Sequence, residues 1–98
     1  MIEHTVCFTL VHPEGSEAER AFLTGAREVL TAVPGVQGFT VSRQVSPKSA
    51  FRFRFSMRFA DEDAYRAYDA HPAHTAFVAQ RWATEVREFQ ELDFTPWP

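Results

Sequence analysis

Residues 50–59 alternate bulky apolar side chains with polar ones along almost the whole stretch. The odd positions carry Phe51, Phe53, Phe55, Met57 and Phe59, and the even positions carry Arg52, Arg54, Ser56 and Arg58. Because successive side chains of a β-strand point to opposite faces, this pattern predicts a strand with one apolar and one polar face. A sheet that contains this strand has one face suited to a core and a second face of different character.

Similar local patterns predict the elements around this strand. Residues 2–11 alternate in the same way, and their apolar side includes His4. Ser16 and Glu19 have the spacing of a capping box, which starts a helix near Glu17 that runs to Val33 and is stopped by Pro34-Gly35. We expect two more strands, a weak one over residues 36–45 and a closing one over residues 88–95.

The second helical region is expected to be split. Asp61 can cap a helix that runs as far as the His71-Pro72 step. Residues before proline avoid the α region, whereas proline suits the first position of a helix, so we expect a break at His71 and a new helix from Pro72. The apolar residues that this new helix should bury are Phe77, Val78 and Trp82.

The resulting order of elements is β-α-β-β-α-β with a split second helix. It is the ferredoxin-like pattern, an α+β fold in which a four-stranded antiparallel sheet carries helices on one face. A chain of 98 residues has the length of one domain, and neither a linker nor an internal repeat divides residues 1–98. We therefore expect a single domain.

Composition indicates that this domain has an apolar surface to cover. Hydrophobic residues make up 45% of the chain, more than a compact monomer of this size easily buries. The second sheet face, with Thr5 and Cys7 beside the arginines, is too mixed for a core. We expect a homodimer in which two sheets pack face to face and close an α/β barrel, with arginines paired to Glu3 or Glu91. A solvated strand face and an anion site are the alternatives.

Charge and length patterns exclude several partners. The net charge is -3 and no run of lysine and arginine occurs, which argues against nucleic acid. No apolar run approaches the roughly 18 residues of a membrane span, and no leader pattern begins the chain. Cys7 is the single cysteine, which excludes an intrachain disulfide and fits a reducing compartment. We expect a cytoplasmic protein without nucleic-acid or membrane partners.

The segment from Tyr68 to His74 is the main candidate for chemistry. It brings one phenol and two imidazoles, Tyr68, His71 and His74, close to one helix start. Histidine titrates near neutrality and suits a general base, and a tyrosine hydroxyl suits a donor to an enolate oxygen. An aldol or Claisen cyclisation needs both groups and no metal. The spacing is therefore compatible with acid–base catalysis without a cofactor.

The same residues also have structural interpretations. His71 can cap the new helix, and His74 can bond a backbone carbonyl or a carboxylate. Tyr68 can be a core residue with its hydroxyl at the rim. A metal site is a weaker alternative, because His71, His74 and Asp69 offer only three ligands and no cysteine supports them. His4 is interpreted first as a hydrogen-bonded edge histidine.

Several short motifs, in order along nearly the whole chain, resemble one known family. They are Met1-Ile2-Glu3-His4-Thr5-Val6-Cys7-Phe8, Val33-Pro34-Gly35-Val36, Val45-Ser46-Pro47, Phe59, Ala67-Tyr68, His71-Pro72-Ala73-His74 with Phe77, and Asp93-Phe94. The chain resembles the stress-responsive dimeric α/β-barrel family, Dabb. The resemblance implies homodimers of ferredoxin-like subunits, in proteins often described as stress responsive.

Some members of that family cyclise polyketides without a cofactor, and the resemblance implies roles for two residues. The histidine at the position of His74 is the general base in cyclase-type members, and the tyrosine at the position of Tyr68 holds or polarises the substrate. A further active-site histidine of those cyclases falls near Phe53, where this chain has no ionisable group. The resemblance thus supports the base and the donor but not the third group.

These arguments give one leading hypothesis. We expect a homodimeric, cofactor-free protein that binds a small apolar or aromatic carbonyl compound, with cyclase or isomerase chemistry if it is an enzyme. His74 is the candidate base and Tyr68 the candidate donor. The candidate binding residues are His71, Phe22, Phe53, Phe55, Trp82 and His4. The alternatives are a non-enzymatic stress-associated protein for assembly or ligand sequestration, and a cofactor-free oxygen-dependent oxidation of an aromatic compound.

Overall fold

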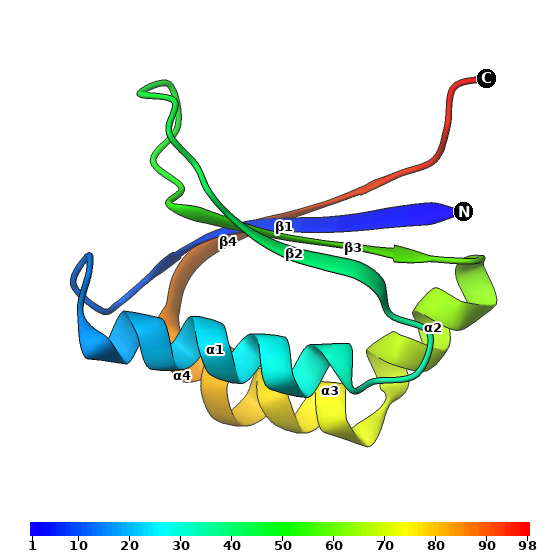
Figure 1. The fold of residues 1–98 in the computed structure, drawn as a ribbon, viewed down its shortest axis with the longest axis horizontal. Helices are drawn as coiled ribbons and strands as arrows, with labels where there is room; N and C mark the ends of the chain where they lie inside the picture. The colour runs from blue at the N-terminus through cyan, green and yellow to red at the C-terminus, as the bar shows by residue number, and fades with distance from the viewer.

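The computed structural model describes all of residues 1–98 and confirms the ferredoxin-like order of elements. Helices cover one face of a four-stranded antiparallel sheet with strand order β2-β3-β1-β4, and the other face is bare (Figure 1). The elements are β1 (Ile2–Leu10), α1 (Glu17–Thr31), β2 (Gln37–Arg43), β3 (Phe53–Phe59), α2 (Glu62–Ala70), α3 (Pro72–Phe77), the π-helical turn η1 (Val78–Trp82), α4 (Ala83–Glu85) and β4 (Val86–Phe94).

Strand β1 lies in the middle of the sheet and pairs with a neighbour on each side. Its Val6 is opposite Phe55 of β3 and Glu91 of β4, and its His4 is opposite Met57 and Asp93. Side chains directly across an antiparallel pair share a face. The helix-facing side of the sheet is therefore apolar on β1 and β3 apart from His4, but it carries two carboxylates on β4.

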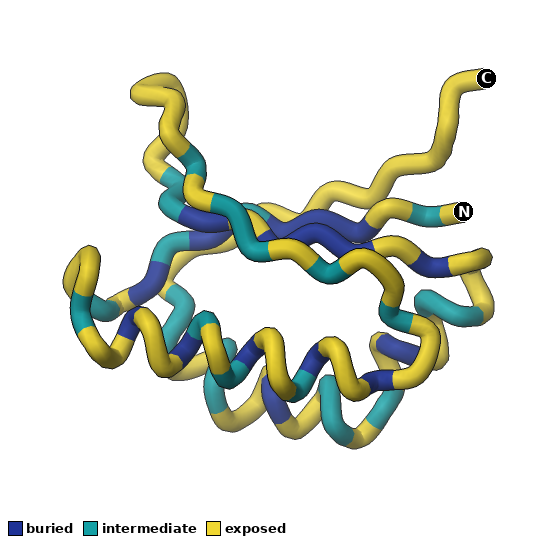
Figure 2. Tube along the Cα trace, viewed as in Figure 1, coloured by how far each residue is buried: buried dark blue, intermediate teal, exposed yellow.

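Phe8 is the centre of the core that forms beneath this face. Its side chain is fully buried, and its ring lies 4.6 Å from that of Phe55 and 5.1 Å from that of Trp82, measured between centroids. Burial follows the helix-facing sides of the central strands and the sheet-facing sides of the helices (Figure 2). Packing of aromatic rings from strands and helices thus holds the two layers together.

Helix α1 starts where the capping pattern predicts but ends earlier than expected. The backbone N–H of Glu19 donates to Ser16 Oγ over 3.2 Å, while the Glu19 carboxylate accepts from Gly15 N–H rather than from Ser16. The helix ends at Thr31 rather than at Val33. Val33 lies in the turn that follows and is still buried in the core, so its position in the apolar pattern does not mean that it is helical.

Strands β2 and β3 are shorter than their alternating sequence predicts. The side-chain amide of Gln44 donates to the carbonyls of Ser49 and Phe51, which holds this part of the connection in a loop, and β3 begins only at Phe53. In β2, Gly38 has φ of +60° at a register shift between Gln37 and Thr40. The positive φ favours glycine at this position, whereas the Arg58 guanidinium that a Cβ would meet is the flexible end of a side chain.

The split of the second helical region is confirmed, but the helix after it differs from expectation. His71 has extended backbone angles between α2 and α3. The helix from Pro72 widens into the π-helical turn η1, which places Val78 partly in solvent instead of in the core. Strand β4 then starts at Val86, two residues earlier than expected.

The bare sheet face carries mixed side chains, as the sequence indicates. Its exposed apolar residues include Leu92 and Phe94 of β4, on the same face as Thr5 and Cys7. The expected pairing of an arginine with Glu91 is wrong, because Glu91 lies on the helix-facing side opposite Val6. No helix has the length and apolar character needed to cross a membrane.

The position of Phe8 gives a test of this packing. Replacing the buried ring in Phe8→Ala should lower the free energy of unfolding by about 3–5 kcal/mol, because large aromatic residues leave a cavity when truncated. Urea unfolding followed by circular dichroism measures this change. Val45→Ala is the control, since Val45 is 88% exposed, and its unfolding midpoint should stay close to that of the wild type. Equal midpoints for both variants would contradict the proposed core.

Candidate functional site

The break between α2 and α3 is built by His71 and Pro72. His71 Nδ1 accepts a hydrogen bond of 3.1 Å from Ala73 N–H and so caps α3, while Pro72 occupies the first helical turn, where its missing N–H is harmless. Asp61 caps α2 in the same manner through Ala64 N–H. These local bonds fix where α3 begins, and they place His74 in its first turn.

His74 is held by a backbone carbonyl. Its Nδ1 lies 2.9 Å from the carbonyl oxygen of Asp69, and the carboxylate Oδ1 of Asp69 is 4.0 Å away. A carbonyl oxygen can only accept, so Nδ1 of His74 must donate the proton. In the neutral ring this leaves the lone pair on Nε2, which forms no hydrogen bond within the chain and is reached by solvent.

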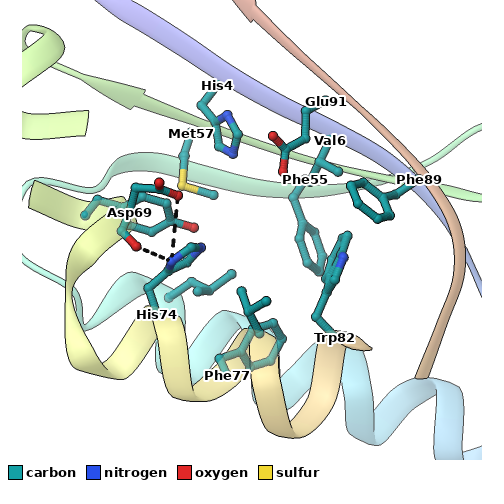
Figure 3. A pocket seen from close by; sticks show the side chains of 13 residues that line it. His4, Val6, Phe55, Met57, Asp69, His74, Phe77, Trp82, Phe89 and Glu91 are labelled. Carbon is teal, nitrogen blue, oxygen red and sulfur yellow. Dashed lines mark hydrogen bonds and ion pairs between the residues drawn. The ribbon is translucent and has the colours of Figure 1, made fainter. Parts of the chain in front are cut away.

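His74 borders a cavity of about 200 Å³ between the sheet and the helices α3 and η1 (Figure 3). The cavity has mostly apolar walls, formed by residues such as Phe55, Met57, Phe77, Trp82 and Phe89. Its polar lining comes from His4, Tyr68, Asp69, His74 and Glu91. An apolar space with a few converging polar groups is the usual form of a small-molecule site.

Tyr68 lies directly against His74 and keeps its proton. The two ring centroids are 4.4 Å apart, and the Tyr68 side chain is almost fully buried. Burial raises the pKa of the Tyr68 hydroxyl well above its usual value, and the nearby Tyr65, Asp69 and Glu91 raise it further. A hydroxyl that does not ionise remains a hydrogen-bond donor over the whole physiological pH range.

His4 contributes a second imidazole from the central strand. It is buried, its Nδ1 lies 2.6 Å from Asp93 Oδ1, and its ring packs 4.9 Å from that of Tyr65. An ionised carboxylate accepts only, so Nδ1 again donates and Nε2 carries the lone pair of the neutral ring. Since β1 is an inner strand, His4 lies at the end of the core and not at a sheet edge.

The structure brings five of the candidate residues to one cavity and leaves three outside it. His74, Tyr68, His4, Phe55 and Trp82 line it. Phe22 is fully buried in the core, where its ring packs against those of Phe8 and Phe77. Phe53 lines a separate groove with Arg27 and Arg43, because β3 carries it toward the far end of the sheet.

His71 is the third candidate outside the cavity. Its imidazole is used as the cap of α3, so it acts on the site only by placing His74. No group of three or more histidine, cysteine and acidic side chains is arranged to hold a metal ion. His71, His74 and Asp69 therefore do not form the metal site considered as an alternative.

Sequence reasoning missed two acidic residues of the cavity, Asp69 and Glu91. Asp69 holds His74 through its backbone carbonyl, for which a sequence carries no signal. Glu91 was expected on the opposite sheet face. The alternation of Phe89, Glu91 and Asp93 could have placed it, once the register of β4 against β1 was fixed.

Comparison with known families agrees with this architecture. Residues 2–96 match the profile of Dabb, the stress responsive A/B barrel domain. The chain belongs to the Dabb family. A Dabb protein with a ferredoxin-like fold from Mesorhizobium loti is 48% identical, with a TM-score of 0.98 over 99% of this chain and 97% of the other. A comparison with curated proteins finds no match.

Two more distant structures share the fold of this Dabb protein. A dimeric ferredoxin-like protein of unknown function from Thermobifida fusca is 19% identical, with a TM-score of 0.77 over 97% of this chain and 90% of the other. SnoaB, a cofactor-independent oxygenase from Streptomyces nogalater, is 19% identical, with a TM-score of 0.71 over 97% and 91% of the two chains. At these identities the likeness extends to the fold alone.

The hydrogen bonds of the two neighbouring histidines predict opposite tautomers. In the neutral protein, His74 should carry its proton on Nδ1, which donates to the Asp69 carbonyl, and His71 should carry its proton on Nε2, because Nδ1 accepts from Ala73. Long-range ¹H–¹⁵N correlation spectra of the ¹⁵N-labelled protein distinguish these forms, with His71 as internal control. A His74 ring protonated on Nε2 would contradict the arrangement.

Proposed function

We propose that this Dabb protein is a cofactor-free acid–base enzyme of the cyclase or isomerase type that acts on a small apolar or aromatic carbonyl compound. The observation that carries the proposal is the hydrogen bond of His74: its Nδ1 lies 2.9 Å from the Asp69 carbonyl, which leaves Nε2 without a partner on a side chain that lines the cavity. A base needs this combination of a fixed ring and an unoccupied lone pair.

The groups around His74 support both halves of an enolisation. Nε2 takes the α-proton of the bound carbonyl compound, and the electron pair of the broken C–H bond moves into the enolate. The Tyr68 hydroxyl, kept protonated by burial, donates a hydrogen bond to the enolate oxygen. The ring that gains this proton keeps its Nδ1–H bond of 2.9 Å to the Asp69 carbonyl, and the Asp69 carboxylate lies 4.0 Å away. The enolate carbon then attacks a second carbonyl, and the alkoxide that forms takes the proton from His74 Nε2; in an isomerisation the enolate instead takes this proton at another carbon. Either route returns His74 to its neutral form.

The dimensions of the cavity support a small substrate. Drug-sized ligands occupy pockets of roughly 300–1,000 Å³, whereas this cavity measures about 200 Å³. Its aromatic walls favour a flat, apolar molecule, on which the few polar groups at one end act. The competing function is ligand sequestration without chemistry, which requires the cavity but neither the His74 tautomer nor the protonated Tyr68.

Exchange of α-protons tests the proposed chemistry without knowledge of the natural substrate. In D₂O the wild type should accelerate deuterium incorporation into the methyl group of acetophenone, followed by proton NMR. His74→Ala should reduce this acceleration by at least about 100-fold, the usual contribution of a positioned base, and Tyr68→Phe by about 10-fold or more, since it removes one donor.

The control for this assay is His71→Asn, which keeps a capping side chain at the start of α3 but removes an imidazole. It should exchange acetophenone protons at the wild-type rate. Binding of acetophenone to the wild type without any acceleration over buffer would support sequestration and contradict the enzyme proposal. Equal rates in the wild type and in His74→Ala would remove His74 from the mechanism.

We also propose that the chain functions as a homodimer through the bare face of its sheet. Similar structures include a protein described as dimeric, and this face exposes 44% of Leu92 and 48% of Phe94. Packing two such faces together removes this apolar surface from water and closes a barrel. The ligand cavity lies on the other side of the sheet, so association would not occupy it.

Light scattering after gel filtration tests the dimer. At micromolar concentration the wild type should have twice the mass of the chain. Leu92→Arg should shift it toward the monomer, because a charged side chain in the middle of an apolar contact is unfavourable. Glu28→Arg on the exposed side of α1 is the control and should remain dimeric. A monomeric wild type would contradict the proposal.

A further inference from the structure

The fixed charges around the cavity are all negative. Asp69 and Glu91 line it, and no lysine or arginine does. The two lining histidines carry a positive charge only when they are protonated. A ligand that enters while the histidines are neutral therefore meets carboxylates without any compensating cation.

Glu91 differs from the other carboxylates near the cavity because it has no partner. Asp93 is bound by His4 at 2.6 Å, and Asp69 lies 4.0 Å from His74. The Glu91 carboxylate forms neither a hydrogen bond nor an ion pair within the chain. Figure 3 shows it descending from β4, while His74 rises from α3 on the other side of the cavity. Because Glu91 is exposed, water solvates its carboxylate in the free protein, and no group of the chain competes with a ligand for this acceptor at the sheet side of the site.

The negative charge of Glu91 affects the two tyrosines near His74. The pKa values of Tyr68 and Tyr65 are both raised above the usual range, first by burial, and in both cases the negative charge of Glu91 raises them further. Glu91 thus acts on the same space that the substrate carbonyl would occupy. Because Glu91 is exposed at the mouth, solvent weakens this effect but does not remove it.

Building on the proposed function, we infer that Glu91 selects the substrate by charge. The substrate is a small carbonyl compound that carries a hydrogen-bond donor, ideally a protonated amine, at the end that faces Glu91, while its carbonyl faces His74 and Tyr68. This donor forms a charge-assisted hydrogen bond to the Glu91 carboxylate, which has no other partner in the chain. A carboxylate or phosphate on the substrate would instead repel Glu91 and Asp69, so anionic carbonyl compounds are poor ligands.

Three para-substituted acetophenones that differ mainly in charge test this inference. They are 4-(aminomethyl)acetophenone, which is cationic, 4-(hydroxymethyl)acetophenone, which is neutral, and 4-acetylbenzoate, which is anionic. Calorimetry gives their dissociation constants, and the chemical shifts of the His74 ring show whether each one occupies the cavity. In the wild type the amine should bind about fivefold more tightly than the alcohol, and the alcohol more tightly than the acid, as expected for a partly exposed charge.

Glu91→Gln removes the charge but keeps the shape, and it should reduce the preference for the amine over the acid to near unity. Glu28→Gln makes the same change in net charge on the exposed side of α1, away from the cavity lining, and it should keep the wild-type order. Together the two variants separate a local effect of Glu91 from an effect of overall protein charge.

Two outcomes would overturn the inference alone, with the proposed function intact. They are binding of all three probes at His74 with no preference for the amine, and an unchanged preference in Glu91→Gln. A third outcome would overturn the proposed function as well. If none of the probes moves the His74 resonances, the cavity does not hold carbonyl compounds and the selection by Glu91 falls with it.

Discussion

The site depends on the pairing of β1 with β4. Strand β1 is the only element that contacts both β3 and β4 by a ladder of backbone hydrogen bonds, and its helix-facing side chains set the positions of those beside them. A shift of β4 by one residue would turn Glu91 and Asp93 to the bare face of the sheet. The bond of 2.6 Å between His4 and Asp93, which lie directly opposite each other, fits the observed register. The register of the β1–β4 ladder thus determines the charge of the cavity, and this contact supports it.

The sequence predicts the interiors of the strands and helices well, because each is governed by a period that burial enforces. It fails at their ends, where single side chains compete with the regular backbone. Gln44 binds two carbonyls and delays the start of β3, and Gly38 introduces a shift into β2. Helix α1 also ends earlier than predicted, because Val33 continues the apolar pattern but is buried in the turn after the helix. Periodicity alone does not distinguish these cases.

The candidate site was predictable in part for a related reason. The positions of Tyr68 and His74 could be predicted, because a proline and an N-cap fix their place on adjoining helices. The hydrogen-bond partner of His74 could not be predicted from the sequence. Every residue has a backbone carbonyl, and only the fold brings that of Asp69 to His74. Glu91 was placed beside the arginines of the other sheet face, because both faces of residues 88–95 carry acidic and apolar side chains and the alternation does not assign them. The pairing of β4 with β1 decides which carboxylates face the cavity, and the sequence of β4 alone does not give this pairing.

In the proposed mechanism Tyr68 is the donor and His74 the base, and the burial of Tyr68 opposes proton transfer between them. Transfer of the Tyr68 proton to His74 would create a phenolate in a buried position, close to the charges of Asp69 and Glu91, and these same factors raise the pKa of Tyr68. The Nδ1–H of His74, by contrast, is bonded to the Asp69 carbonyl at 2.9 Å, and the Asp69 carboxylate lies 4.0 Å away. The negative charges of Asp69 and Glu91 therefore add to burial in holding the proton on Tyr68. In the proposed mechanism the two residues therefore keep distinct roles because their surroundings, and not their chemistry alone, separate them.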